Sequence, residues 1–188
     1  MKDLKRKWSD PPVYRTRPLP VGELQGSFLV AQSTIVATRE ALISFALAGI
    51  RDGGHEGMAF WAGREADGAT LIFQTIVPNA DHSDQRVMAS AEAVGKAARA
   101  ARGSGLGILC QVHSHPGSDA RHSDGDDDLV LLPFEGMLSI VVPDFGVRFS
   151  SLADSCVHQF QIGKWVLCSP KSVASNMVVV PSSVDLRA

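Results

Sequence analysis

Two histidines separated by one residue are the strongest chemical signal in this sequence. His113 and His115 flank a single serine at the end of an apolar run. On an extended segment, side chains two residues apart project to the same side, so both imidazoles can reach one metal ion. A carboxylate from the next element would complete three nitrogen and oxygen ligands, and three such ligands with an open fourth position are typical of catalytic zinc. The sequence therefore predicts a catalytic zinc site.

An acidic run follows the histidines, and ligand chemistry alone does not identify which of its carboxylates binds the metal. Asp124, Asp126, Asp127 and Asp128 all follow Ser123 within five residues. Ser123 and Asp126 also have the spacing of a helix capping box, which gives both residues a structural interpretation. The run lacks the alternating oxygen ligands and the terminal glutamate of an EF-hand, so we exclude a calcium loop of that type.

The full pattern is His-x-His, seven residues, Ser, two residues and Asp, with a proline after the second histidine. This pattern resembles the signature of the JAMM/MPN metalloprotease family. The resemblance implies that His113, His115 and Asp126 bind the metal and that Ser123 donates a hydrogen bond to the oxyanion formed at the attacked carbonyl. It also implies an α/β fold of the cytidine-deaminase-like type, in which helices flank a mixed β-sheet within a single compact domain.

A hydrolase of this kind needs a general base, which takes a proton from the attacking water and passes it to the leaving amine. Glu56 is the candidate, because it precedes an apolar segment that ends at Gly63 and is similar to the family's upstream glutamate. Three other glutamates are weaker candidates, because Glu40 and Glu92 lie in predicted helices and Glu65 lies in a turn.

Composition limits the class of protein. The chain has 188 residues, enough for one domain with a substantial core, and its net charge of -2 gives no general attraction to nucleic acid or an anionic membrane. Its three cysteines are an odd number without CxxC spacing, which favours a reducing cytoplasm over a disulfide framework. No apolar run approaches the length of a membrane span, and the basic N-terminus lacks the apolar core of a secretory signal.

Proline and charge patterns divide the chain into three parts. Residues 1–22 contain four prolines and a basic cluster, and we expect an extended arm there. Residues 23–170 form the expected JAMM/MPN catalytic domain. Residues 171–188 are expected to be a tail, in which the valines at 178–180 weakly suggest an edge strand.

Hydrophobic periodicity predicts the elements that position the motif. Helices are expected at 33–48, capped by Ser33 or Thr34, and at 87–102 and 123–132. Strands are expected at 56–62, 70–77, 106–113, 137–142, 146–150, 157–162 and 164–167. The two histidines of the motif would then lie at the end of a buried strand.

The remaining histidines carry no predicted role. We expect His82 and His122 to face solvent, His55 to lie in a loop and His158 to lie on the surface of the sheet. Cys110 precedes the motif on the buried strand, and we expect it to be a small core residue.

The resemblance also implies a substrate. Between Gly117 and Leu132 there is little room for the insertions with which eukaryotic deubiquitinating members clamp ubiquitin. The stretch from His55 to Gly63 looks more like prokaryotic JAB proteins, which are associated with bacterial ubiquitin-like conjugation systems. The expected substrate is thus a ubiquitin-like modifier or its conjugates, cleaved after a terminal glycine because a narrow groove admits a backbone without a side chain. The expected partners are the matching activating and conjugating enzymes.

Two alternatives stay open. One is a peptidase of the same family that acts on a small peptide or a sulfur-carrier protein. The other is a non-catalytic MPN scaffold, which is disfavoured because such members usually lack the ligands that this chain retains.

Overall fold

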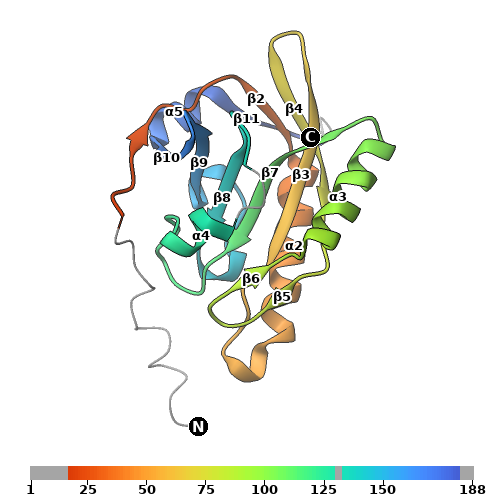
Figure 1. Ribbon diagram of the computed structural model, residues 1–188, viewed down its shortest axis with the longest axis vertical. Coiled ribbons are helices and arrows are strands. Elements are labelled where there is room, and N and C mark those ends of the chain that lie inside the picture. The colour runs from red at the N-terminus through yellow and green to blue at the C-terminus, as the bar shows by residue number, and fades with distance from the viewer. Residues whose placement is uncertain (1–16, 130–132, 183–188) are drawn as a thin grey trace, which may run out of the picture.

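A computed structural model describes residues 17–129 and 133–182, which include all five residues of the predicted site. Within these ranges, nine strands form one mixed sheet at the centre of the molecule (Figure 1). In spatial order they are β1 (Val21–Gly22), β10 (Lys164–Cys168), β9 (Cys156–Gln161), β8 (Leu138–Val142), β7 (Gly107–Ser114), β3 (Met58–Ala66), β4 (Ala69–Ile76), β2 (Phe28–Ala31) and β11 (Met177–Val180). Two short strands, β5 (Asp81–His82) and β6 (Val87–Met88), pair separately.

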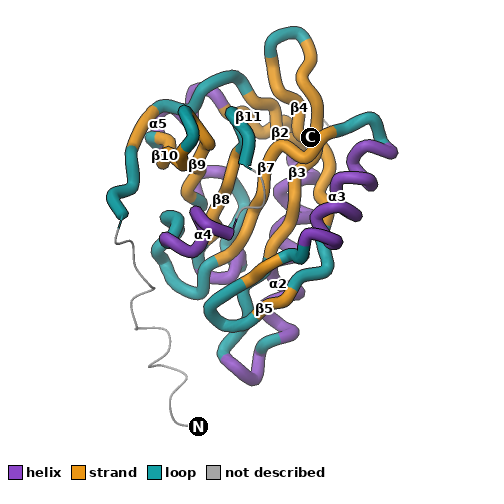
Figure 2. The backbone as a smooth tube through the Cα atoms, in the orientation of Figure 1, coloured by secondary structure: helices purple, strands orange, loops and turns teal. Residues whose placement is uncertain are grey.

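Helices cover both faces of this sheet (Figure 2). They are α2 (Gln32–Ala48), α3 (Ala91–Gly103), α4 (Asp124–Leu129) and α5 (Pro170–Asn176), with short 3-10 turns η1 (Ile50–Asp52), η2 (Asp144–Gly146) and η3 (Leu152–Asp154). Neighbouring residues of a strand face opposite sides, and Trp61 packs into the main core whereas Phe60 packs against α3. Among the described helices, none is both long and apolar enough to cross a membrane.

The strand that carries the first histidine lies near the middle of the sheet. β7 pairs with β8 in parallel and with β3 in antiparallel orientation, so that His113 lies opposite Val141 and Met58. Cys110 and Val112 are fully buried in the main core, as expected for a strand covered on both faces. The expected strand at 106–113 is thus confirmed, and it gives His113 a rigid support.

Helix starts differ from the sequence-based expectation. α2 begins after Ala31, and no side chain caps it, so the predicted cap by Ser33 or Thr34 is wrong. α3 begins only at Ala91, because Val87 and Met88 pair with β5 instead of extending the helix. Ser90 caps α3 by accepting the backbone N–H of Ala93. The buried residues of α3 are Ala93, Ala97 and Ala101 at i, i+4 spacing, and Val94 packs partly buried against the cluster that contains Ala93 and Ala97.

The strand predicted at 146–150 does not form. The chain instead makes the turn η2, in which Asp144 and Phe145 have φ values of 51° and 53° and Gly146 has a φ of 77°. Val147 then takes the helical conformation, with φ of -56° and ψ of -37°, and the backbone N–H of Phe149 donates to the carbonyl of Gly146. A turn therefore replaces the strand, and the expectation is wrong. The backbone N–H of Phe145 donates to the carbonyl of His115, so this turn holds the backbone of the second histidine of the motif.

Both ends of the described chain join the sheet. Val21 and Gly22 pair with β10, so the last residues of the predicted arm belong to the sheet; the arm's first sixteen residues lie outside the described part. The weakly suggested edge strand is confirmed as β11, which pairs with β2 in parallel. The boundary expected at residue 170 corresponds to no structural break, because α5 starts there and leads directly into β11.

Candidate metal centre

Three predicted ligands converge at the end of β7. The Nε2 atoms of His113 and His115 are 3.2 Å apart. Asp126 places Oδ1 3.3 Å from Nε2 of His113 and Oδ2 3.2 Å from Nε2 of His115. Among the described residues, these three form the one group of histidine, cysteine or acidic side chains that is close enough to share a metal ion. The structure thus brings together the ligand set that the sequence predicted.

The spacing of these atoms fits a small tetrahedral ion. Nitrogen and oxygen ligands about 2.0–2.1 Å from zinc lie roughly 3.3 Å from one another at the corners of a tetrahedron. The closest approaches between the three side chains are 3.2, 3.2 and 3.3 Å, with Oδ1 of Asp126 nearest to His113 and Oδ2 nearest to His115. Separations of this size suit three side chains that share one zinc ion and leave a fourth position to another molecule. Two imidazoles and one carboxylate are also ligands that zinc favours.

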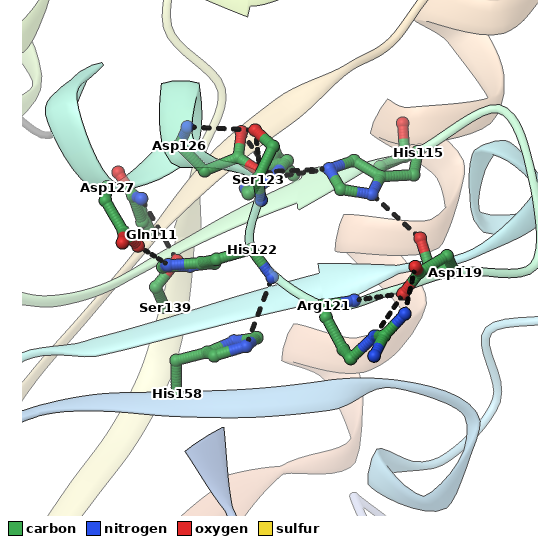
Figure 3. A network of polar contacts seen from close by, with 12 residues as sticks. Gln111, His115, Asp119, Arg121, His122, Ser123, Asp126, Asp127, Ser139 and His158 are labelled. Carbon is green, nitrogen blue, oxygen red and sulfur yellow. Dashed lines mark hydrogen bonds and ion pairs between the residues drawn. The ribbon is translucent and has the colours of Figure 1, made fainter. Parts of the chain in front are cut away.

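His115 is oriented from behind by a backbone carbonyl. Its Nδ1 lies 2.8 Å from the carbonyl oxygen of Asp119, so Nδ1 carries the hydrogen and Nε2 faces the other ligands. The Asp119 carboxylate in turn accepts hydrogen bonds from the backbone and guanidinium of Arg121 (Figure 3). The hydrogen bonds among His115, Asp119 and Arg121 fix the conformation of the loop between β7 and α4.

Charge couples the ligands when no metal is bound. Burial by itself would raise the pKa of Asp126, yet the charges and hydrogen bonds of the two histidines hold that pKa well below its usual range. Burial would by itself lower the pKa of His115, but the hydrogen bond and charge of Asp126 outweigh it and raise that pKa. Because a ligand imidazole must be neutral at Nε2, we expect metal affinity to rise with pH.

Ser123 and Asp126 form the capping box at the start of α4. The Ser123 Oγ accepts the backbone N–H of Asp126 at 3.1 Å, and Oδ2 of Asp126 accepts both the backbone N–H and the hydroxyl of Ser123, at 2.7 and 2.9 Å. The two sequence interpretations therefore coexist, because the same box that starts the helix directs the carboxylate of Asp126 towards the histidines.

Glu56 lies in the loop two residues before β3, whereas the sequence predicts a strand that starts at Glu56 itself, and it is 7% exposed. The backbone N–H of the next residue, Gly57, donates to Oγ of Ser114 at 2.9 Å, and the N–H of Ser114 donates to the carbonyl of Gly57 at 3.0 Å. A Cβ atom at Gly57 would lie 2.7 Å from the ring of Phe45 on α2, so only glycine lets the loop pack this closely against that helix. Ser114, the residue between the two histidines, thereby fixes the base relative to the ligands, a role the sequence analysis missed.

Burial gives Glu56 the acidity of a neutral-pH base. Loss of solvent raises the pKa of Glu56 from 4.5 to about 7; the nearby charge of His115 opposes this rise, and those of Asp126 and Asp84 add to it. A general base is most effective when its pKa is close to the working pH. Glu56 therefore has the pKa that the predicted role of a general base requires.

This raised pKa predicts how stability depends on pH. The folded carboxyl holds its proton more tightly than the unfolded one, so its contribution to the free energy of unfolding falls as pH rises from 4.5 to about 7. Glu56→Gln stays neutral, and in chelator we expect its melting temperature to rise relative to the parent across that window. Thermal denaturation at a series of pH values measures this difference. A difference that stays constant with pH would contradict the assigned burial.

The other histidines depart from expectation. His122 and His158 are 1% and 0% exposed, so the predictions of a solvent-facing and a sheet-surface residue are wrong. Their rings stack with centroids 3.9 Å apart beneath the metal ligands. His82 is half-buried, and its Nδ1 lies 2.8 Å from Nδ1 of His55 in the loop before Glu56. Cys110 is a buried core residue, as expected.

Comparison with known proteins agrees with this geometry. A probable metalloprotease, y4jG of Sinorhizobium fredii, is 34% identical over 133 residues, which cover 69% of this chain and 82% of the relative. The solution structure of protein DSY2949 from Desulfitobacterium hafniense superposes with a TM-score of 0.59 at 16% identity, covering 82% of this chain and 94% of that protein. Residues 38–152 match the family described as prokaryotic homologs of the JAB domain. The chain, in which two histidines and an aspartate converge beside a buried glutamate-bearing loop, belongs to this JAB/MPN family.

Proposed function

We propose that this protein is a zinc-dependent peptidase that hydrolyses the amide or isopeptide bond after the C-terminus of a ubiquitin-like modifier. The observation that carries the proposal is the cluster of His113, His115 and Asp126, whose side chains approach one another to 3.2–3.3 Å. The Sinorhizobium relative is named a probable metalloprotease, which supports the same class of reaction.

The three ligands would hold the ion, and each remaining residue has a defined task. Bound zinc supplies Lewis acidity and lowers the pKa of a water molecule towards about 7. Glu56 takes the proton from the attacking water and then delivers it to the departing amine. Its pKa of about 7 allows it to act in both directions near neutral pH. Ser123 turns its hydroxyl from Asp126 to the oxyanion that develops on the attacked carbonyl.

An apolar pocket beside the ligands supports a peptide substrate. It has a volume of about 230 Å³, and His113 and Asp126 form part of its wall. Most of its other lining side chains are apolar; among them are Met58, Phe60, Val94, Ala98 and Met137. A pocket of this kind accepts an apolar side chain of a substrate whose backbone passes the metal ligands. We propose that the C-terminal tail of the modifier supplies this side chain and ends in glycine at the cleaved bond.

The direct test combines metal content with a substrate panel. Protein purified without chelator should contain one zinc per chain by elemental analysis. It should release a reporter fused through a C-terminal glycine to a ubiquitin-like protein, and cleave short peptides of the same tail sequence far more slowly. Equal rates on short peptides would remove the modifier from the proposal and leave the peptidase. A zinc-loaded protein that cleaves no member of the panel would leave only a non-catalytic scaffold.

Ser123→Ala separates the two roles of the serine. Loss of the cap should lower stability by roughly 1 kcal/mol. Loss of the oxyanion donor should lower kcat by about 10²-fold or more at full zinc occupancy. Ser123→Thr keeps the hydroxyl and is the matched control. Ser123→Asp should restore neither role, because its carboxylate would lie against that of Asp126, whose Oδ2 is 2.9 Å from the serine Oγ. A near-normal kcat for Ser123→Ala would assign the residue to the cap alone.

A further inference from the structure

A buried chain of polar side chains connects the two elements that carry the metal ligands. On α4, Oδ1 of Asp127 lies 2.9 Å from Nδ1 of His122. Nε2 of His122 lies 2.8 Å from Oγ of Ser139 on β8, and Nε2 of Gln111 on β7 donates to the same oxygen at 3.0 Å. Figure 3 shows these four side chains in sequence between α4 and the sheet.

All the hydrogen bonds between these four side chains point in the same direction, from Gln111 towards Asp127. Burial lowers the pKa of His122 against the opposing effect of Asp127, so the imidazole is neutral at pH 7 and carries one N–H. The carboxylate of Asp127 can only accept, which places that hydrogen on Nδ1. Nε2 then accepts the hydroxyl hydrogen of Ser139, whose oxygen accepts from Gln111. Each group donates to the next, an arrangement in which hydrogen bonds strengthen one another.

The order Asp127, His122, Ser139 resembles a Ser-His-Asp catalytic triad, but it has no access to a substrate. Ser139 is 0% exposed and His122 is 1% exposed. His122 is further enclosed by the stacked ring of His158, whose Nε2 accepts the backbone N–H of His122 at 3.3 Å. A nucleophile must reach its substrate, so this chain has a structural task and not a covalent one.

α4 has an unusual need for such an anchor. Its first five residues are Asp124-Gly125-Asp126-Asp127-Asp128, which offer no apolar side chain to bury against the sheet. Among the described side chains of α4, only those of Asp124, Asp126 and Asp127 can fix its position, and they do so through polar contacts. This short helix nevertheless carries the third metal ligand. Asp127 directly follows Asp126, and Gln111 lies two residues before His113 on the same side of β7. These hydrogen bonds thus connect the residue next to Asp126 with a residue close to His113 on β7.

We propose that His122 is a positioning residue of the metal centre: its hydrogen bond to Asp127 fixes α4 against the sheet and so holds the Asp126 carboxylate at the spacing that zinc requires. This inference rests on the metal site of the proposed function. It assigns a role to a residue that touches neither the metal nor the substrate. Residues that orient a metal ligand from behind typically change metal affinity by about 10–100-fold when they are lost.

Three substitutions of His122 test which of its bonds matters. An asparagine places an amide N–H near the position of Nδ1, and a glutamine places its amide near the position of Nε2. We therefore expect His122→Leu to weaken zinc binding by about 10–100-fold, measured by competition with a chromophoric chelator. His122→Asn should recover most of this affinity through Asp127. His122→Gln, which reaches only Ser139, should behave like His122→Leu.

A second variant guards against loss of folding at the buried histidine. Asp127→Ala, at the partly exposed end of the chain, should weaken zinc binding to a similar extent. The double variant with His122→Leu should be no weaker than either single one, because both remove the same bond. Cobalt absorption spectra of the substituted proteins should show reduced intensity at the site in the weakened variants and full intensity in His122→Asn.

The control is Val173→Ala, which removes buried methyl groups from α5 without touching α4. It should lower the melting temperature and leave zinc affinity unchanged. The inference fails if His122→Leu or Asp127→Ala keeps parental zinc affinity, or if Val173→Ala weakens zinc as much as they do. A parent protein that binds zinc but cleaves no substrate would overturn the proposed reaction and not this inference, whereas a parent that binds no zinc would overturn both.

Discussion

Glu56→Gln should lower kcat by about 10³-fold or more while the protein still binds one zinc per chain. The glutamine keeps the size of the side chain and removes the group that accepts and returns the proton. Because Glu56 is not among the three clustered ligands, metal content should be unchanged. Single-turnover cleavage of the modifier fusion, with zinc measured on the same sample, gives both quantities.

The matched control is Glu92→Gln, the same chemical change at an exposed site on α3 where Glu92 pairs with Lys96 at 2.8 Å. It should cleave at the parental rate. If Glu56→Gln kept most of its kcat, another group would be the base and the raised pKa of Glu56 would only reflect its burial. Loss of zinc from Glu56→Gln would instead make the residue a ligand.

Asp126→Ala should abolish both zinc binding and cleavage. Two imidazoles alone hold zinc weakly, and the carboxylate also supplies the negative charge that offsets the ion. In chelator, the variant should melt below the parent at neutral pH. The folded pKa of Asp126 is lowered, so its stabilising contribution is present above the unfolded pKa of 3.8 and is lost as pH falls below it. The gap between the two melting temperatures should therefore narrow under acid conditions.

Glu40→Ala is the control for this change, because it removes an exposed acid from α2 and should affect neither zinc nor cleavage. Stoichiometric zinc in Asp126→Ala would show that another carboxylate of the acidic run serves as ligand. The sequence alone left that alternative open, since Asp124, Asp127 and Asp128 have the same chemistry.

Much of the site follows from local sequence. His113 and His115 were predicted to share a face at a strand end, and Ser123 and Asp126 to form a capping box, and each of these features depends on residues close together in the chain. Local geometry fixes such features wherever the element forms. Glu56 was found through its similarity to a family pattern, since no local rule connects it to residues more than fifty positions away.

The sequence was less informative about burial and about element boundaries. His122 was expected to face solvent, yet its Nε2 contacts Ser139, a partner of Gln111, and its ring stacks on His158. Those partners come from three different strands. A polar residue is buried when distant groups satisfy its hydrogen bonds, and a window of neighbouring residues carries no information about them.

The sequence by itself thus determined the shared face of the two histidines, the capping box of Ser123 and Asp126, and the strand that supports His113. The choice of Asp126 among the acidic residues came from the family resemblance. The tertiary structure alone decided the rest. It placed Gly57 against Ser114, buried Glu56 until its pKa reached about 7, and paired the suggested edge strand β11 with β2. Each of these features is a contact between segments far apart in the chain. Its free energy depends on which strands pair and in which register, and local residue patterns do not specify that pairing.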